Sequence, residues 1–201
     1  MKSVIAVPFR RKLSGRTNYR KRLALLKSNT PRLVVRKTLT SIIFQVVDLA
    51  EGGDKVMLSM TSKKLKELGW KHSCKNIPAA YLSGLMLGKI ALGRGVNEVV
   101  PDIGFQSVTR GGKIFAAIKG AKDAGLNVQV SDDVVPSNDA ITGSKIATYA
   151  KAAKPVQFAS AGTAAVKISE DFEKTKAVIA AGQFKQASAA TNAPAGDGKK
   201  K

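Results

Sequence analysis

Residues 32–61 read RLVVRKTLTSIIFQVVDLAEGGDKVMLSMT. Three β-rich runs in this stretch, Arg32–Lys37, Ser41–Leu49 and Lys55–Thr61, are separated by connections of hairpin length. Alternation along the first run places its two arginines and Val34 on one face, and its other two apolar residues on the opposite face. We therefore expect an antiparallel three-strand meander whose first strand carries charge on one side.

Downstream of the meander, helical and extended patterns alternate. Asn76 is the predicted N-cap of a helix that continues to about Gly93, and a β-like run, Glu98–Gly104, follows. A second helix is expected over about 113–124, with Thr109 as its cap. The fold class expected is α/β, a mixed sheet made of the meander and a further strand, with helices packed on it. Shorter helical segments are expected at 22–26, 63–68, 144–152 and 169–181.

Small residues recur at four-residue spacing in the first long helix, at Ala80, Gly84 and Gly88. A glycine inside a helix costs about 1 kcal/mol relative to alanine. These glycines therefore indicate that the helix backbone packs closely on a neighbour, which we expect to be the sheet.

The first 37 residues contain twelve Lys or Arg and no acid. Because like charges repel, such an arm needs an external polyanion. The arm interleaves arginine with Phe9, Thr17, Asn18 and Tyr19. Arginine binds phosphate with two donors, an aromatic ring stacks on an unpaired base, and Asn can hydrogen-bond a base edge, so this mixture favours RNA. A solvated or targeting arm is the alternative.

Composition narrows the class of protein. The chain has 201 residues, and 44% of them are hydrophobic, which excludes wholesale disorder. Its net charge of +20 indicates nucleic acid or an anionic membrane surface as partner. Cys74 is the only cysteine, which excludes an internal disulfide and favours a reducing compartment. The most apolar run, Ile77–Leu92, is too short and too interrupted to span a bilayer. We expect a soluble, cytoplasmic protein.

Catalytic and metal-binding patterns are weak. His72 and Cys74 are close together, but a metal site needs four ligands, and a catalytic pair would need an orienting group and a pocket. Asp48, Asp54 and Asp102 are the acids that a ribonuclease of metal-dependent type could use, yet each stands where an acid is ordinary. We therefore expect no catalytic residue, no metal, no cofactor and no small-molecule substrate.

Two further segments are candidate RNA contacts. The loop 71–75 is basic, and Thr109–Lys113 places backbone N–H groups and two cations at a helix N-terminus. A flexible cap is the alternative for the second segment. Trp70, just before the first loop, is either a core plug or a stacking platform, and the plug is favoured.

Several motifs, taken in order, carry a family resemblance. They are VPFRR (7–11), RTNYRKRL (16–23), LLKS (25–28), PRLVVRK (31–37), GW (69–70), NIPAAYLSGL (76–85), DIG (102–104) and KIFAAIKGAKDAGL (113–126). From Val7 to about Tyr149 the chain resembles the archaeal and eukaryotic branch of ribosomal protein family eighteen of the large subunit, the 5S-rRNA-binding protein.

The resemblance implies a ribonuclease H-like motif without that motif's metal site, and a basic N-terminal arm that binds 5S rRNA. It also implies a structural, non-enzymatic role that anchors 5S rRNA to the large-subunit rRNA in the central protuberance. The implied partners are 5S rRNA, large-subunit rRNA and neighbouring large-subunit ribosomal proteins, with no membrane, and the implied location is the cytoplasm, in the large ribosomal subunit. The alternatives are an RNA-processing enzyme of ribonuclease H-like fold and a non-specific nucleic-acid binder.

The expected division of the chain is a basic RNA-binding arm (1–30), an α/β core domain (31–150), a C-terminal extension with a charged helix (151–185) and a disordered tail (186–201). The predicted RNA-binding residues are Phe9, Arg10, Arg11, Lys12, Arg16, Thr17, Asn18, Tyr19, Arg20, Lys21, Arg22, Lys27, Arg32, Arg36, Lys37, Lys71, His72, Lys75, Arg110 and Lys113.

Overall fold

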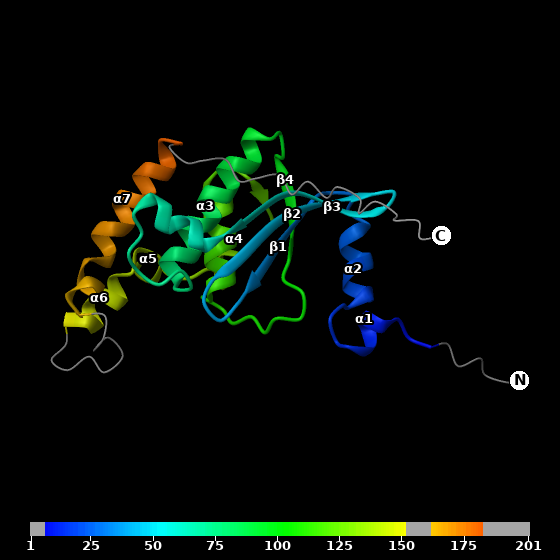
Figure 1. Cartoon of the computed structure of the whole chain (residues 1–201), viewed down its shortest axis with the longest axis horizontal. Helices are drawn as coiled ribbons and strands as arrows, with labels where there is room; N and C mark the ends of the chain where they lie inside the picture. The colour runs from blue at the N-terminus through cyan, green and yellow to red at the C-terminus, as the bar shows by residue number, and fades with distance from the viewer. Residues whose placement is uncertain (1–6, 152–161, 183–201) are drawn as a thin grey trace, which may run out of the picture.

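A mixed β-sheet lies between helices in the computed structural model, which describes residues 7–151 and 162–182 (Figure 1). The helices are α1 (Arg10–Leu13), α2 (Tyr19–Leu26), α3 (Ile77–Gly93), α4 (Lys113–Asp123), α5 (Asn138–Thr142), α6 (Ser144–Lys151) and α7 (Ile168–Ala180). The strands are β1 (Arg32–Lys37), β2 (Ile42–Ala50), β3 (Gly53–Thr61), β4 (Glu98–Asp102) and β5 (Asn127–Val128). Short 3₁₀ helices are η1 (Ser62–Leu68), η2 (Asp132–Val134) and η4 (Gly162–Lys167).

Within the described residues the strand order is β3-β2-β1-β4-β5. The first three strands form the predicted antiparallel meander, with Arg32 opposite Val47 and Lys37 opposite Ile42. The chain then crosses through α3 to β4, which runs parallel to β1, and through α4 to β5, which runs parallel to β4. The expected α/β class and mixed sheet are confirmed, and the two-residue strand β5 completes the sheet at its edge beside β4.

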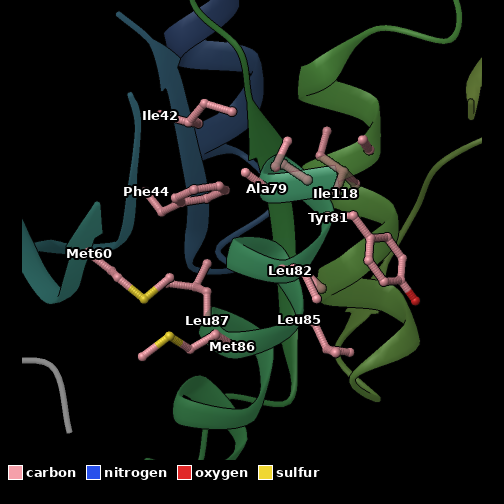
Figure 2. Packing of buried hydrophobic residues seen from close by; sticks show 14 of the residues in the cluster. Ile42, Phe44, Met60, Ala79, Tyr81, Leu82, Leu85, Met86, Leu87 and Ile118 are labelled. Atoms are coloured by element: carbon pink, nitrogen blue, oxygen red, sulfur yellow. The ribbon is translucent and has the colours of Figure 1, made fainter. Parts of the chain in front are cut away.

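The two faces of the sheet differ in what covers them. Leu33 and Val35 of β1, and Ile42 and Phe44 of β2, are at most 1% exposed and belong to the hydrophobic core. Figure 2 shows Ile42 and Phe44 directed toward the buried side chains of α3, with Ile118 of α4 nearby. The opposite face of β1 carries its two arginines, as the alternation predicted.

The main helices begin close to where the sequence placed them. Asn76 caps α3 by accepting a hydrogen bond from the N–H of Ala79 at 2.9 Å, as predicted. The expected cap of α4 is wrong, because Gly112 and not Thr109 occupies the N-cap position. The backbone carbonyl of Thr109 accepts a hydrogen bond from the N–H of Gly112. Over residues 7–151 and 162–182, no helix is both long and apolar enough to cross a membrane.

The glycines of α3 pack on a helix and not on the sheet. A Cβ atom on Gly84 would overlap the carbonyl oxygen of Ala117 in α4, and one on Gly88 would lie 2.9 Å from the carbonyl oxygen of Ala121. In return, a Cβ on Gly120 of α4 would overlap the backbone of α3. The close approach predicted from the small residues exists, but the predicted partner was wrong, since two parallel helices form this interface.

The loop after η1 is anchored in the core. Trp70 is 2% exposed and donates its indole N–H to the carbonyl of Ser73 at 3.2 Å, so the plug interpretation is confirmed. Cys74 is buried, and burial raises the pKa of its thiol. Phe172 of α7 is 1% exposed and lies 5.9 Å from the ring of Tyr81, so α7 joins the same core.

Candidate nucleic-acid interface

The part of the arm that the structure describes forms two short helices, α1 and α2, in which no residue is buried. Asn18 is the N-cap of α2, and its side-chain oxygen accepts a hydrogen bond from the N–H of Lys21 at 3.1 Å. The ring of Tyr19 lies 5.0 Å from that of Phe9. The sequence assigned Asn18 and Tyr19 to bases, and the structure gives each of them a local partner as well.

A groove of about 670 Å³ separates this arm from the open face of the sheet. Its floor is largely apolar, with Val34, Val47 and Val56 from the three meander strands beside Gln45 of β2. Leu25 of α2 lines its arm side. Phe105, which is 58% exposed, is also part of the lining. The charged residues of its wall are Arg11, Arg16, Lys21, Arg22, Arg32, Arg36, Asp54 and Asp102. Six cations and two acids therefore surround an apolar floor.

Three of these cations, Arg22, Arg32 and Arg36, form ion pairs with the two acids; we call them the groove arginines, and Asp54 and Asp102 the groove carboxylates. Each carboxylate touches two arginines at distances between 2.7 and 3.4 Å. An arginine that is paired with a carboxylate moves less than one that is surrounded only by water. The groove arginines are therefore already paired with carboxylates before any ligand arrives.

Arg32 is the most enclosed of the three, with 4% of its side chain exposed. Its Nη2 lies 2.7 Å from Oδ1 of Asp54 but outside hydrogen-bond alignment, so this contact is an ion pair only. Its Nη1 donates to Asp102 at 3.4 Å. The sequence predicted Arg32 as an RNA contact, and the structure places its guanidinium between two carboxylates beneath the groove surface.

Most other predicted cations of the arm are exposed. They are Arg10, Arg11, Lys12, Arg16, Arg20, Lys21 and Lys27. Arg11 donates through Nε to the hydroxyl of Thr17 at 2.8 Å, a contact that orients the arginine at the groove. Phe9 is 69% exposed, so one face of its pair with Tyr19 stays accessible.

A second group of cations lies where α3 and α4 begin. Lys75 immediately precedes the cap of α3, Lys113 is the first residue of α4, and both are exposed. Lys37 is also exposed and donates through Nζ to the carbonyl of Ser107, in the segment that leads to α4. Although the side chain of Lys113 reaches solvent, partial burial lowers its pKa, and the nearby charges of Lys75 and Lys37 lower it further. These three lysines, which we call the lysine cluster, therefore lie near one another.

The other predicted RNA contacts near the starts of α3 and α4 differ in how exposed they are. Lys71 and Arg110 are exposed. His72 points inward, with 8% of its side chain exposed, and its Nε2 lies 3.0 Å from Oδ2 of Asp171 on α7. The T-shaped contact of its ring with Trp70, at 5.0 Å, encloses it further. The structure thus gives His72 a role in fastening α7.

The acids considered for metal-dependent chemistry do not come together. In the part of the chain that the structure describes, no three His, Cys, Asp or Glu side chains form a group that could hold a metal. Asp54 and Asp102 are bound to arginines, and Asp48 accepts a hydrogen bond from the neighbouring N–H of Leu49.

The groove belongs to an α/β fold, and its excess of cations over acids would suit a polyanionic ligand. Residues 4–99 match the model of a family described as ribosomal large subunit proteins 60S L5, and 50S L18. This match covers just under half of the chain and supports a large-subunit ribosomal protein of the L18 family, to which its motifs also pointed. The same match supports an rRNA-binding role in translation. The motifs after residue 99 lie outside the matched region.

Proposed function

We propose that this protein binds 5S rRNA through the arm and the groove, and anchors that RNA to the large-subunit rRNA in the central protuberance. The observation that carries the proposal is the groove, in which six cations and two acids surround an apolar floor. The groove lies in the region that matches the ribosomal family, apart from its lining residues 101–105.

The chemistry of the groove suits RNA with unpaired nucleotides. Arginine and lysine side chains on its walls can neutralise phosphates, and guanidinium planes can stack on bases. An apolar floor and the exposed rings of Phe9 and Phe105 offer surfaces on which a base can lose contact with water. A duplex keeps its bases stacked inside, so it would use the cations but not the floor.

The lysine cluster, together with Lys71 and Arg110, is proposed as the contact with the large-subunit rRNA. Its support is the absence of any acid from three segments, residues 37–41, 71–76 and 103–113. Neighbouring ribosomal proteins are further proposed partners. The role is proposed to be non-enzymatic and cytoplasmic, and the strand order supports the ribonuclease H-like motif that the resemblance implies.

The proposal is tested by binding titrations of the full chain with 5S rRNA and with an unrelated RNA hairpin, at several salt concentrations. The test variant replaces two groove cations, Arg16→Ala with Lys21→Ala. Its affinity for both RNAs should fall, and the slope of log affinity against log salt should become shallower by about 0.7–0.9 for each phosphate that is no longer neutralised. Tyr19→Ala should weaken mainly 5S rRNA, since stacking needs particular unpaired bases.

The matched control is Lys145→Ala with Lys174→Ala, which removes the same charge from α6 and α7 at exposed positions. Figure 1 shows these helices at the end of the molecule opposite the arm. The proposal is wrong if the wild type shows no preference for 5S rRNA, or if the control variant loses as much affinity as the groove variant.

A further inference from the structure

A continuous chain of ion pairs crosses the wall of the groove in the order Arg22, Asp54, Arg32, Asp102, Arg36. Asp54 Oδ1 lies 2.9 Å from Nη2 of Arg22 and 2.7 Å from Nη2 of Arg32. Asp102 Oδ2 lies 3.4 Å from Nη1 of Arg32, and its Oδ1 lies 3.1 Å from Nη2 of Arg36. The five side chains come from α2, β1, β3 and β4, so the chain of ion pairs joins the arm to the middle of the sheet.

We propose that the groove carboxylates determine RNA specificity, by fixing the positions of the groove arginines and cancelling most of their charge. This inference rests on the proposed RNA-binding function of the groove. In this inference the two acids help the protein to bind a polyanion, although their own negative charge repels it.

Neutralisation is the first part of the argument. Three arginines and two carboxylates leave a single net positive charge in the ion-pair chain. A polyanion attracted only by charge therefore gains little from this part of the wall. Weak attraction of unrelated RNA increases the ratio between specific and non-specific binding, and specificity is that ratio.

Fixed geometry is the second part. The side chains of Arg22 and Arg36 are each 35% exposed, so part of each guanidinium can still be reached from the groove. An arginine already held in place loses less side-chain entropy when it binds phosphate. RNA whose phosphates match the spacing of the exposed donors gains charge-assisted hydrogen bonds, and RNA with another spacing does not.

Simple charge counting predicts the opposite behaviour. If Asp54 only repelled RNA, its replacement by Asn would strengthen binding to every RNA by a similar factor. If Asp54 positions Arg22 and Arg32, the same replacement should lower the affinity for the RNA that fits the groove. It should raise the affinity for other RNAs. The two interpretations thus differ in the sign of one measurement.

The experiment compares Asp54→Asn and Asp54→Glu with the wild type, in titrations on 5S rRNA and on an unrelated hairpin at several salt concentrations. For Asp54→Asn we expect the affinity for 5S rRNA to fall by about ten- to a hundredfold, the loss of one charge-assisted hydrogen bond. Binding to the hairpin should strengthen, with a salt slope steeper by about 0.7–0.9 for each additional phosphate that is neutralised. Asp54→Glu keeps the charge and moves the carboxylate, so it should weaken 5S rRNA and leave the hairpin unchanged.

The control is Asp48→Asn, which removes the same charge from β2, opposite Lys55 and outside the groove lining. It should change the affinity for both RNAs by the same small factor. Thermal melts accompany every variant, and Asp54→Glu decides the question by itself if Asp54→Asn does not fold.

A wild type that binds both RNAs equally would contradict the proposed function and this inference with it. A wild-type preference for 5S rRNA that Asp54→Asn keeps or increases overturns the inference alone, and so does an Asp54→Glu variant that binds 5S rRNA like the wild type.

Discussion

Lys113 carries its charge at a position where the fold disfavours it. Burial lowers the pKa of this lysine below its ordinary value of 10.5, and the charges of Lys75 and Lys37 lower it further. Binding sites often carry charges that destabilise the folded protein when no ligand is bound, because stability and function compete there. Lys113 carries a charge of this kind.

The first prediction concerns this charge. Because the folded-state pKa of Lys113 is below its unfolded value, the penalty is fully present below the folded pKa and disappears as pH rises toward 10.5. Lys113→Met should therefore raise the melting temperature at pH 7, and by less at pH 10. Lys119→Met, on the same helix, controls for the methionine itself. A gain of equal size at both pH values would contradict the prediction.

Individual residues also show what the sequence could not provide. The exposed cations of the arm were predictable, because charge without compensation must lie at the surface. The partners of Arg32 were not, since Asp102 stands 70 residues away and reaches it only through the parallel pairing of β1 with β4. Asn18 has the residue type of a helix cap, and that signal could have extended the predicted helix back to Tyr19.

Among the elements, the helices α3 and α4 bring their backbones unusually close together. Their glycines allow two parallel backbones to meet, and Gly84 faces the carbonyl oxygen of Ala117. Backbone atoms on both sides leave no flexible group that could move aside. The spacing of the glycines predicted this closeness, but a face that fits a helix also fits a sheet, so the partner stayed undetermined by sequence.

Gly84→Ala should destabilise the protein by about 1–3 kcal/mol or more, the usual effect of forcing a group into a packed interface. Gly93→Ala, at the end of the same helix, is the control, because a Cβ there meets nothing within 4 Å. Denaturant unfolding of both variants measures the difference. Equal stability of Gly84→Ala and the wild type would mean that the two helices can separate at no cost.

At the scale of the whole molecule, α7 completes the hydrophobic core. Ile168, Phe172 and Ile179 are at most 2% exposed and belong to the same cluster as the sheet and α3. The sequence predicted a charged helix over 169–181 but assigned it to an extension. The residue pattern of this helix does not indicate which surface the helix packs against. The proposed boundary at residue 150 stays a prediction about domains.

We expect Phe172→Ala to lower the free energy of unfolding by about 3–5 kcal/mol, as large-to-small changes at buried aromatic positions do. Phe105→Ala provides the control, because Phe105 is 58% exposed and lies outside the core cluster. Chemical unfolding followed by circular dichroism measures both. A decrease below about 1 kcal/mol for Phe172→Ala would show that α7 contributes little to stability.

The positions of the ion-pair partners in the sequence also determine the order in which the ribosome synthesises them. Asp54 is made 32 residues after Arg22, and Asp102 is made 70 residues after Arg32. Translation at about 5–20 residues per second separates these partners by about 2–6 s and about 4–14 s. During that interval the nascent chain displays arginines whose counter-charges do not yet exist, one of which the finished fold encloses. Any polyanion beside the growing chain therefore competes with the protein's own carboxylates for the same guanidinium groups.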